Sequence, residues 1–499
     1  MANTKQNIAI IGSGFLGMTL ALRLAERGDH VTLFESANEI GGLASAWEIG
    51  GHTWDRHYHV TLLSDTNTRK IVEEIGLADE FRWVETKTGF YTEGELVSMS
   101  DTMEFLKFPP LSLVGKLRLG ATIFAASRIK NWKRLEKISV EKWLTRLSGR
   151  KTFNKIWKPL LKAKLGDAYK ETSAAFIWAT IQRMYAARNS GLKKEMFGYV
   201  RGGYARVLER FGEVLIEKGI EVRLNAKVRE VEKLANGKFA VRQVDARRKS
   251  DARPRIMPAK TKYAAYSTAA VAARGFSAGF MTEPQPSLTT VREFPRERRE
   301  DNFDKVILTC PSDVAAEIMP ELHRTEKTDL KNIRYQGIVC ASVLMRKSLS
   351  DYYVTNITDE APFTGVIEMT ALVDKKDFGH NALVYLPKYV APDDELFDKT
   401  DDEIRELFLT RLSEMYPQFN EKDVIAFKVS RVRQVFPIPT LNYSRDLPKM
   451  KTSVDGAYIV NSSHIVNGTL NVNETVALAE KFFAELENEA DSEPITRPR

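Results

Sequence analysis

The first forty residues alternate between apolar runs and polar positions in a strand–helix–strand pattern. Residues 8–11 form an uninterrupted apolar run that predicts a buried strand, and the apolar positions of residues 16–27 recur at helical spacing. A second apolar run, residues 30–34, predicts another strand, which ends at the acidic Glu35. Because a helix commonly connects two parallel strands, the pattern predicts a βαβ unit at the N-terminus.

The rest of the chain mixes helical and strand patterns, which is typical of an α/β protein. Residues 103–200 are mostly helical in pattern. Further helices are predicted at 66–76, 205–218 and 401–415, and from about Val472 onward. Strands are predicted within 46–60 and at 220–224, 226–231, 238–244, 303–309, 338–345, 364–370 and 382–386. We expect the strand at 303–309 to pair with the strand at 238–244.

Residues 245–301 interrupt this order of elements. The segment opens and closes with basic clusters at 247–249 and 292–299, and it holds an alanine-rich block near 264–273. A connection of that length without its own secondary structure is rare inside a compact domain. We therefore predict a surface insertion or a disordered segment. Its basic clusters could bind an acidic partner, but a solvated loop is the favoured interpretation.

A glycine motif lies between the first strand and the first helix. Gly12 permits a tight turn, Gly14 permits close approach of a pyrophosphate, and Gly17 permits close packing of helix and strand. The helix N-terminus offers free N–H groups to the phosphates, and Glu35 lies where a carboxylate accepts the ribose hydroxyls. An acid at that position would repel the 2′-phosphate of NADP. The motif therefore predicts the ADP-ribose part of FAD or NAD, and leaves the choice between them open.

Composition and charge narrow the class of protein further. At 499 residues the chain is too long for one core, so two or three domains are expected. The formal charge of +8 is modest and does not indicate a nucleic-acid partner. Cys310 and Cys340 are the two cysteines, so we expect no metal site and no disulfide framework. The sequence has no run of 18 apolar residues, and the default expectation is a cytoplasmic protein.

Four further motifs follow the first in a recognisable order. They are Gly41-Gly42 after Glu35, Arg201–Tyr204 before a helix and residues 221–231, the strand and turn at 304–311, and residues 456–464 with Asn467-Gly468-Thr469 before the last helix. In this order the motifs resemble those of the flavoprotein superfamily of amine oxidases, protoporphyrinogen oxidases and phytoene-type desaturases. The segments 55–59 and 157–167 are most similar to those of its bacterial protoporphyrinogen-oxidase-like and desaturase-like members.

The resemblance implies FAD as the cofactor and assigns residues to it. Val228 would contact the adenine through its backbone. Leu43 stands where the family commonly has arginine, and Asn461 stands where it commonly has aspartate, although an amide can still hydrogen-bond a pyrophosphate or ribitol. The residues assigned to FAD are Gly12, Gly14, Phe15, Leu16, Gly17, Glu35, Gly41, Gly42, Leu43, Val228, Asn461 and Thr469.

The resemblance also implies a fold in two parts. The first is a Rossmann-type, glutathione-reductase-like FAD-binding domain assembled from residues 1–105, 200–330 and 430–499. The second is a discontinuous α+β substrate domain assembled from residues 106–199 and 331–429. NAD alone would leave the closing motif near the C-terminus without a role.

The expected reaction is transfer of a hydride from a substrate C–H bond, of CH–CH or CH–NH type, to N5 of the flavin. His57 and His59 are the acid/base candidates by position, because imidazole titrates near neutral pH. The other interpretation is that both are structural polar residues. The substrate is expected to be a small molecule, and the sequence does not indicate the electron acceptor.

Three further positions are candidates for contact with the substrate. Lys164, or its neighbour Lys162, could hold an anionic substrate or the flavin, although the sequence favours a solvated helix face. Trp54 and Tyr204 are candidate pocket walls, and the alternative is that they are core aromatics.

Residues 109–134 place an apolar stripe among lysine and arginine side chains. This pattern suits a helix that lies on an anionic membrane surface, and such a position would suit a lipophilic substrate. The protein would then be cytoplasmic and peripherally bound to the inner face of the membrane. The alternative is a helix packed on the protein's own core.

Two other functions remain open at the level of sequence. A non-redox flavoenzyme similar to UDP-galactopyranose mutase is one, and Arg183, Arg188 and Arg201 are the arginines that could hold a nucleotide diphosphate. A non-catalytic flavin-binding protein is the other, and the departures at Leu43 and Asn461 are its only support.

Overall fold

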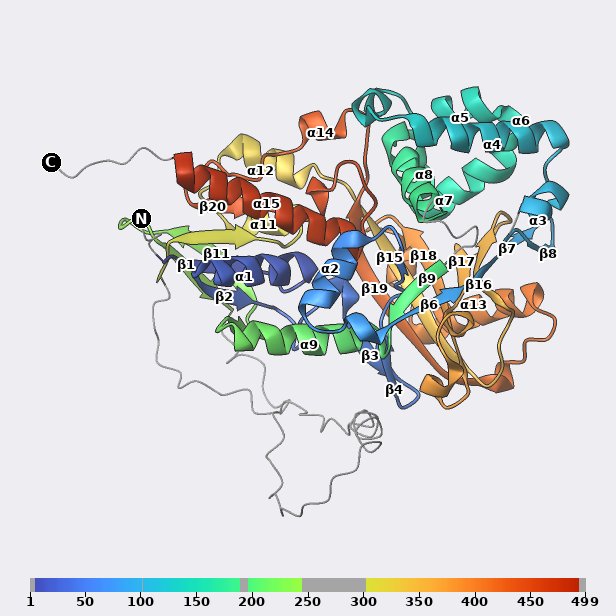
Figure 1. Ribbon diagram of the computed structural model, residues 1–499, viewed down its shortest axis with the longest axis horizontal. Helices are drawn as coiled ribbons and strands as arrows, with labels where there is room; N and C mark the ends of the chain where they lie inside the picture. The colour runs from blue at the N-terminus through green and yellow to red at the C-terminus, as the bar shows by residue number, and fades with distance from the viewer. Residues whose placement is uncertain (1–4, 101, 189–195, 245–301, 493–499) are drawn as a thin grey trace, which may run out of the picture. The chain divides into compact units, whose positions relative to one another are not determined.

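The N-terminal strand–helix–strand unit lies at the centre of a five-stranded parallel sheet (Figure 1). The computed structural model describes residues 5–100, 102–188, 196–244 and 302–492. The sheet has the order β10-β2-β1-β14-β20, and all of its neighbours are parallel. Its strands are β1 (Asn7–Ile11), β2 (His30–Phe34), β10 (Glu221–Arg223), β14 (Lys305–Leu308) and β20 (Ala457–Ile459).

Both faces of this sheet are buried, which is why β1 reads as a continuous apolar run. Ile8 and Ile10 pack into a core with α1 (Phe15–Arg27), α9 (Gly203–Glu217) and α15 (Val472–Ser492). Ala9 and Ile11 point to the other face, because successive side chains of a strand alternate. That face is covered by α11 (Ser312–Ile318) and by an antiparallel sheet of β11 (Val228–Lys233), β12 (Phe239–Gln243) and β13 (Asn302–Phe303).

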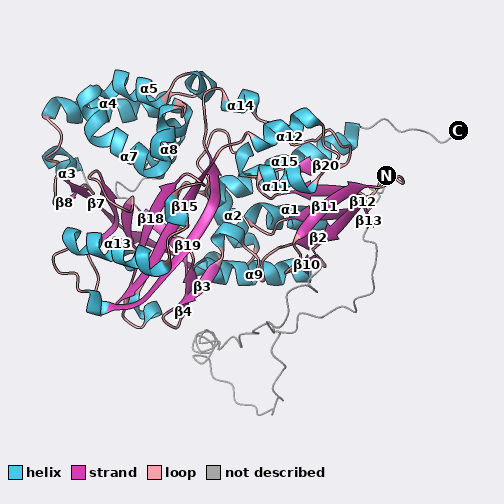
Figure 2. Cartoon of the chain, turned by 180° about the vertical axis from the view of Figure 1, so that it is seen from behind, coloured by secondary structure: helices cyan, strands magenta, loops and turns pink. Residues whose placement is uncertain are grey.

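A seven-stranded mixed sheet forms the second large structure (Figure 2). All of its neighbours are antiparallel except β16 and β7. Helix α13 (Asp401–Met415) begins with a capping box between Thr400 and Glu403 and packs on the sheet through Ile404 and Phe408. In order, the strands are β19 (Val424–Pro437), β15 (Tyr335–Met345), β18 (Ala382–Val390), β17 (Gly365–Glu368), β16 (Tyr352–Ile357), β7 (Lys87–Thr92) and β8 (Glu95–Ser98).

Residues 102–188 are mostly helical, as their pattern predicts. Their core is aromatic, and Trp157 Nε1 donates to Ser148 Oγ at 2.9 Å within it. Figure 1 shows these helices gathered together. They are α3 (Thr102–Lys107), α4 (Leu113–Arg128), α5 (Val140–Ser148), α6 (Arg150–Thr152), α7 (Lys158–Leu165) and α8 (Ala174–Arg188).

Short elements complete the described chain. Helix α2 (Thr66–Glu74) packs beside α15, and α12 (Arg324–Lys331) follows α11. The remaining elements are the hairpin β3 (Ala46–Ile49) and β4 (His52–Asp55), a small sheet of β5 (Thr61–Leu62), β9 (Met196–Val200) and β6 (Phe81–Glu85), and α14 (Tyr443–Asp446).

The predicted strand at 303–309 is two strands in the structure. Residues Asn302–Phe303 pair with β12, as expected, but Lys305–Leu308 leave that sheet and pair with β1 and β20. The change of sheet occurs at Asp304, whose N–H donates to Asn7 O at 2.7 Å and whose carboxylate accepts from Asn7 N at 2.8 Å. The apolar run at 303–309 predicts a buried strand, but it does not indicate with which sheet each part of the run pairs.

At two places, the predicted FAD-binding domain includes residues that belong to the seven-stranded sheet. Residues 87–98 fall in the predicted FAD-binding domain but form β7 and β8 of the seven-stranded sheet. Residues 430–437 likewise belong to β19 of that sheet. The segment 245–301, predicted as an insertion, lies outside the described residues. Among the described helices, none is both long and apolar enough to cross a membrane.

Candidate functional site

Two glycine loops lie side by side at the carboxyl end of β1. Gly14 and Gly41 form a parallel bridge, and Gly41 N donates to Ser13 O at 2.9 Å. A Cβ added at Gly17 would lie 2.0 Å from Gly12 O, so only glycine lets α1 approach the strand this closely. No atom lies within 4 Å of the Cβ position of Gly14, so its backbone faces open space. The loops are thus packed against the protein on one side and accessible on the other.

Glu35 is held beside these loops by four hydrogen bonds. Its Oε2 accepts from Ser13 N at 3.0 Å and from Ser13 Oγ at 2.6 Å. Its Oε1 accepts from Ala37 N at 2.8 Å and from Ser36 Oγ at 3.2 Å. The two backbone bonds fix the carboxylate, while each serine hydroxyl can rotate and release a lone pair to a ribose hydroxyl.

The start of α1 completes a site for phosphate. Its N-cap is Gly14, which provides no side-chain hydrogen bond to the first turn. The N–H groups of that turn therefore keep their donors for another acceptor, and the positive end of the helix dipole favours an anion. Phe15 and Leu16 line the cavity at this point.

The closing motif lies beside the end of β20, where Asn461 holds two turns together. Its amide nitrogen donates to Cys310 O at 2.8 Å and to Ser312 Oγ at 3.1 Å, and its Oδ1 accepts from Ser463 N at 3.0 Å. The side chain thus cross-links the two turns, and its contact with the cofactor stays a prediction. Asn471 Oδ1 accepts from Glu474 N at 3.0 Å and caps α15, whose first turn lines the cavity with Thr469.

These segments surround one cavity of about 1230 Å³. It brings together most of the predicted site residues, although they lie far apart in the sequence. Gly17, Val228 and Trp54 are not among the described residues that line it. Those that line it are Gly12, Gly14, Phe15, Leu16, Glu35, Gly41, Gly42, Leu43, His57, His59, Lys164, Tyr204, Asn461 and Thr469.

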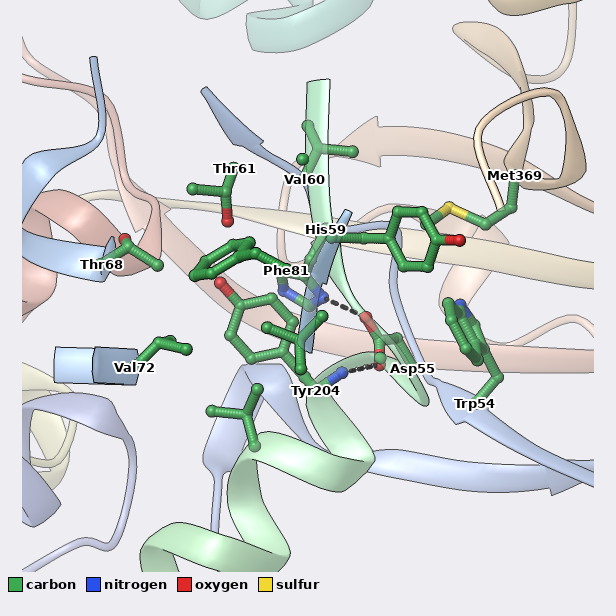
Figure 3. Close-up of a pocket in the computed structure, with 15 residues that line it drawn as sticks. Trp54, Asp55, His59, Val60, Thr61, Thr68, Val72, Phe81, Tyr204 and Met369 are labelled. Carbon is green, nitrogen blue, oxygen red and sulfur yellow. Dashed lines mark hydrogen bonds and ion pairs between the residues drawn. The ribbon is translucent and has the colours of Figure 1, made fainter. Parts of the chain in front are cut away.

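Val228 and Trp54 lie close behind the cavity wall. Val228 begins β11, two residues after Ala226, whose N–H donates to Glu35 O at 2.7 Å. If Val228 contacts adenine as predicted, the contact therefore lies at the end of the cavity near Glu35. Trp54 is 1% exposed and packs edge-on against Phe378 at 5.0 Å. It lines a small void that shares His59 and Tyr204 with the lining of the larger cavity (Figure 3).

Both ring nitrogens of His57 are occupied by the protein. Nδ1 lies 3.3 Å from Leu43 O, and Nε2 lies 3.1 Å from Ser430 Oγ. Since a carbonyl only accepts, Nδ1 carries the proton and Nε2 accepts from the serine. Burial lowers the pKa of His57 to about 3, so the ring is neutral at physiological pH. His57 links the second glycine loop to β19, and its catalytic role stays a prediction.

His59 has a more open environment than His57. Its ring lies against Tyr204 with centroids 5.0 Å apart, and Nδ1 lies 3.6 Å from Asp55 Oδ2 (Figure 3). Asp55 in turn accepts from Tyr204 N at 2.7 Å, which fixes the carboxylate at the start of α9. Burial raises the pKa of Asp55. His59 therefore combines an oriented imidazole with access to the cavity, which is the geometry that an acid or base needs.

Lys164 stands over two aromatic rings in the wall of the cavity. Its Nζ lies 3.7 Å from the centroid of Tyr389 and 5.0 Å from that of Phe436. Burial lowers the pKa of the amine to about 7. The Tyr389 hydroxyl lies 2.9 Å from that of Tyr58. The exposed Lys162, the alternative candidate, lies 4.0 Å from Asp167 instead.

The rest of the cavity wall is mostly apolar and was not predicted. It comes from α4, α7 and α8 on one side and from β15 to β19 on the other. Period-two patterning in β19 was the signal that could have found part of it, because Ser430, Val432, Gln434 and Phe436 all face His57 or the cavity. The apolar lining includes Ile123, Leu160, Phe176, Ile177, Ile181, Met184, Ile338, Ile367, Val435 and Leu470.

The fold and the site together define a class of protein. A parallel βαβ sheet with a glycine cradle, an acid just after its second strand and a second helix N-terminus facing the same cavity is typical of a dinucleotide-dependent enzyme with its own substrate chamber. The cradle fits the ADP part of FAD, since the Cβ position of Gly14 is open, the first turn of α1 has no side-chain cap and the Glu35 carboxylate lies beside both.

Comparison with known proteins gives the family. The chain belongs to the flavin containing amine oxidoreductase family, which it matches over residues 17–254 and 287–471, well over half its length. It is similar to the zeta-carotene desaturase of Synechocystis sp., with 25% identity over 260 residues, which cover 47% of this chain and 52% of the desaturase. The chain thus matches about half the length of the cyanobacterial desaturases.

Solved structures show the same fold at low identity. A protein of Exiguobacterium sp. 255-15, named provisionally as a protoporphyrinogen oxidase, aligns with a TM-score of 0.67 and 16% identity over 98% of this chain and 100% of its own. Reduced UDP-galactopyranose mutase aligns with a TM-score of 0.65 and 13% identity over 98% and 97% of the two chains. The predicted superfamily and the Rossmann-type fold are confirmed. The family is one of flavin-containing oxidoreductases, and the predicted cofactor, FAD, is confirmed.

Proposed function

We propose that the enzyme removes hydrogen from a CH–CH bond of a lipophilic substrate. FAD, when bound, supplies the acceptor for the hydride. The observation that carries the proposal is the lining of the cavity beyond the glycine cradle, where apolar side chains from three helices and the seven-stranded sheet face one chamber. Such a wall excludes water and provides dispersion contact along an apolar chain, but it offers few groups to hold a polar substrate.

The chain's own residues divide the work in this proposal. The glycine loops, Glu35 and the start of α1 hold the ADP part of the cofactor. The turns joined by Asn461 and the start of α15 hold the other end. His59 is the candidate to take or give a proton, since Asp55 orients it while its ring faces the cavity.

The charges in the cavity favour CH–CH over CH–NH oxidation. Among the described lining residues the carboxylates are Glu35 and Asp65. Glu35 lies at the glycine cradle, and Asp65 accepts two hydrogen bonds from Arg183, at 3.0 and 2.7 Å. An ammonium substrate would therefore find no unpaired acid in the chamber, and it would meet Lys164 there.

The test is anaerobic reduction of the bound flavin, followed by its absorption spectrum. Zeta-carotene, the substrate in the relative's name, is offered in detergent micelles, and putrescine is offered as the amine. We expect the isoprenoid to bleach the flavin absorption and the amine to leave it unchanged. Bleaching by putrescine alone would overturn the proposal in favour of amine oxidation.

The two other functions have weaker support. Arg183 is held by Asp65, Arg201 is exposed and does not line the cavity, and the side chain of Arg188 lies outside the described residues. The arginine set for a nucleotide diphosphate is therefore not assembled among the described side chains. Stabilisation by UDP-galactose in a melting assay would restore the mutase hypothesis. A bound flavin that no donor reduces would support the non-catalytic one.

We propose in addition that α4 contacts an anionic membrane surface. Leu113, Val114, Leu117 and Phe124, called here the α4 surface, are 54–66% exposed. Arg128 stacks on Phe124 with its Cζ 4.9 Å from the ring centroid. Exposed cations around apolar side chains suit the interface of an anionic bilayer. The same helix lines the cavity through Ile123, so a lipid-soluble substrate would have a short path inward.

Co-sedimentation with vesicles of phosphatidylglycerol and phosphatidylcholine tests this contact. We expect the protein to pellet with them at low salt and the double variant Val114→Glu, Leu117→Glu to stay in solution. Ile216→Glu is the matched control, because Ile216 is 69% exposed on α9, away from the α4 surface. Pelleting of the double variant, or none of the wild type, would contradict the contact.

A further inference from the structure

Lys164 is a cation without a counter-charge in the apolar part of the cavity. It lies in the last turn of α7, and its Nζ faces the rings of Tyr389 and Phe436. No described residue forms an ion pair or a hydrogen bond with that amine. Its neighbour Lys162 differs, because it is exposed and lies near Asp167 at the surface.

The surroundings of Lys164 are costly for an ammonium ion. Aromatic faces attract a cation, but they do not accept the three N–H donors as an oxygen would. Burial therefore lowers the pKa of the amine to about 7 instead of leaving it fully charged. A charge that is kept inside an apolar wall normally has a partner, and here the protein's described side chains do not provide one.

A second donor lies beside the amine. The hydroxyls of Tyr58 and Tyr389 are 2.9 Å apart, so one proton serves the bond between them. The other hydroxyl proton remains available, because both residues line the cavity. Burial raises the pKa of Tyr58 to about 12 and that of Tyr389 well above its ordinary value, so both remain protonated donors. One ammonium and one phenol are a donor set for a single anionic group with two oxygens.

We propose that Lys164, with the Tyr58–Tyr389 pair, binds the carboxylate of a lipophilic acid whose hydrocarbon chain lies in the apolar cavity. The proposal rests on the proposed function for the class of substrate and deepens it by naming the polar end. A carboxylate fits better than a phosphate ester, because Arg183, the one arginine among the described residues that line the cavity, is already paired with Asp65. The bound anion would supply the counter-charge that the amine lacks.

The test compares decanoate with decan-1-ol, which has the same chain without the charge. Binding to the FAD-loaded enzyme is followed through the perturbation of the flavin absorption spectrum, so no turnover is needed. We expect decanoate to bind about tenfold or more tightly than the alcohol, the size expected of a charge-assisted hydrogen bond. Lys164→Met should abolish this preference, Lys164→Arg should keep part of it, and Lys162→Met should leave it unchanged.

Equal binding of acid and alcohol by the wild type would overturn the proposal, as would a preference that survives Lys164→Met. This outcome is separable from failure of the proposed function. If decanoate binds through Lys164 but no lipophilic donor reduces the flavin, the carboxylate site stands and the reaction is a different one. If zeta-carotene reduces the flavin while decanoate shows no preference, the reaction stands without the carboxylate site.

Discussion

His57, His59 and Lys164 line one cavity, and their partners separate their roles. His57 has a protein partner at each ring nitrogen and serves the fold. His59 has an orienting carboxylate, and its ring is accessible from the cavity. The Lys164 amine faces two aromatic rings, and no other described side chain pairs with it. The sequence names all three as candidates, but only the neighbours brought from distant segments decide which one can act on a ligand.

Gly17→Ala is expected to disrupt the cofactor cradle. Its new Cβ would lie 2.0 Å from Gly12 O, a backbone atom that cannot rotate away, so α1 must shift from the strand. We expect loss of FAD during gel filtration and a lower melting temperature. Gly120→Ala is the control, because nothing lies within 4 Å of its Cβ and alanine favours a helix by about 1 kcal/mol. Retention of FAD by Gly17→Ala would contradict the packing argument.

Lys164→Met is expected to stabilise the protein near neutral pH. The unfolded chain binds a proton at this residue below about pH 10.5, whereas the folded protein binds it only below about 7. The wild type therefore loses stability as pH falls through that window, and the variant does not. We expect the variant's gain in melting temperature to be largest at pH 7 and below, and to vanish near pH 10.5. A gain independent of pH, measured against Lys162→Met, would show that packing alone is responsible.

At the scale of elements, Arg23 joins the helices around the cradle. From α1 it donates to Glu26, to Glu74 of α2 and to Glu480 of α15, at 2.6–2.9 Å, while its side chain is 11% exposed. Arg23→Met should lower the free energy of unfolding by about 1–3 kcal/mol, since the acids lose a shared charged donor. Chemical denaturation measures this. Arg445→Met is the control, because that arginine is 71% exposed and pairs with its neighbour Asp446, and a similar loss there would contradict the argument.

Prediction was uneven between helices and strands, for a physical reason. The helix at 401–415 and the strand at 30–34 were predicted with the bounds that the structure has, because their patterns are local. The longest strand, β19, was missed although Arg431 and Arg433 alternate with residues facing the cavity. Arg431 and Arg433 pair with Asp401 and Asp398, and the sequence pattern does not indicate that these acids lie beside the strand.

At the scale of the whole molecule, the cofactor is expected to hold distant segments together. The cavity is lined by residues from Gly12 to Leu478, so bound FAD would add contacts between segments from distant parts of the chain. Adding FAD at about a hundred times its Kd should raise the free energy of unfolding by about 2.7 kcal/mol. FMN lacks the adenylate part that Glu35 and the glycine loops would hold, so it should stabilise less. Equal stabilisation by both, measured by melting, would contradict the assignment of the cradle.

The sequence by itself determined the βαβ unit, the order of the cofactor motifs and the superfamily, because each motif consists of residues close together in the chain. It also supplied most of the side chains that line the cavity near the cofactor. Tertiary structure decided what those side chains do. It tied His57 to Leu43 and Ser430, moved Trp54 behind the wall and left Lys164 facing Tyr389. The contacts of His57 with Ser430 and of Lys164 with Tyr389 join segments that lie far apart in the sequence, and no local pattern encodes them.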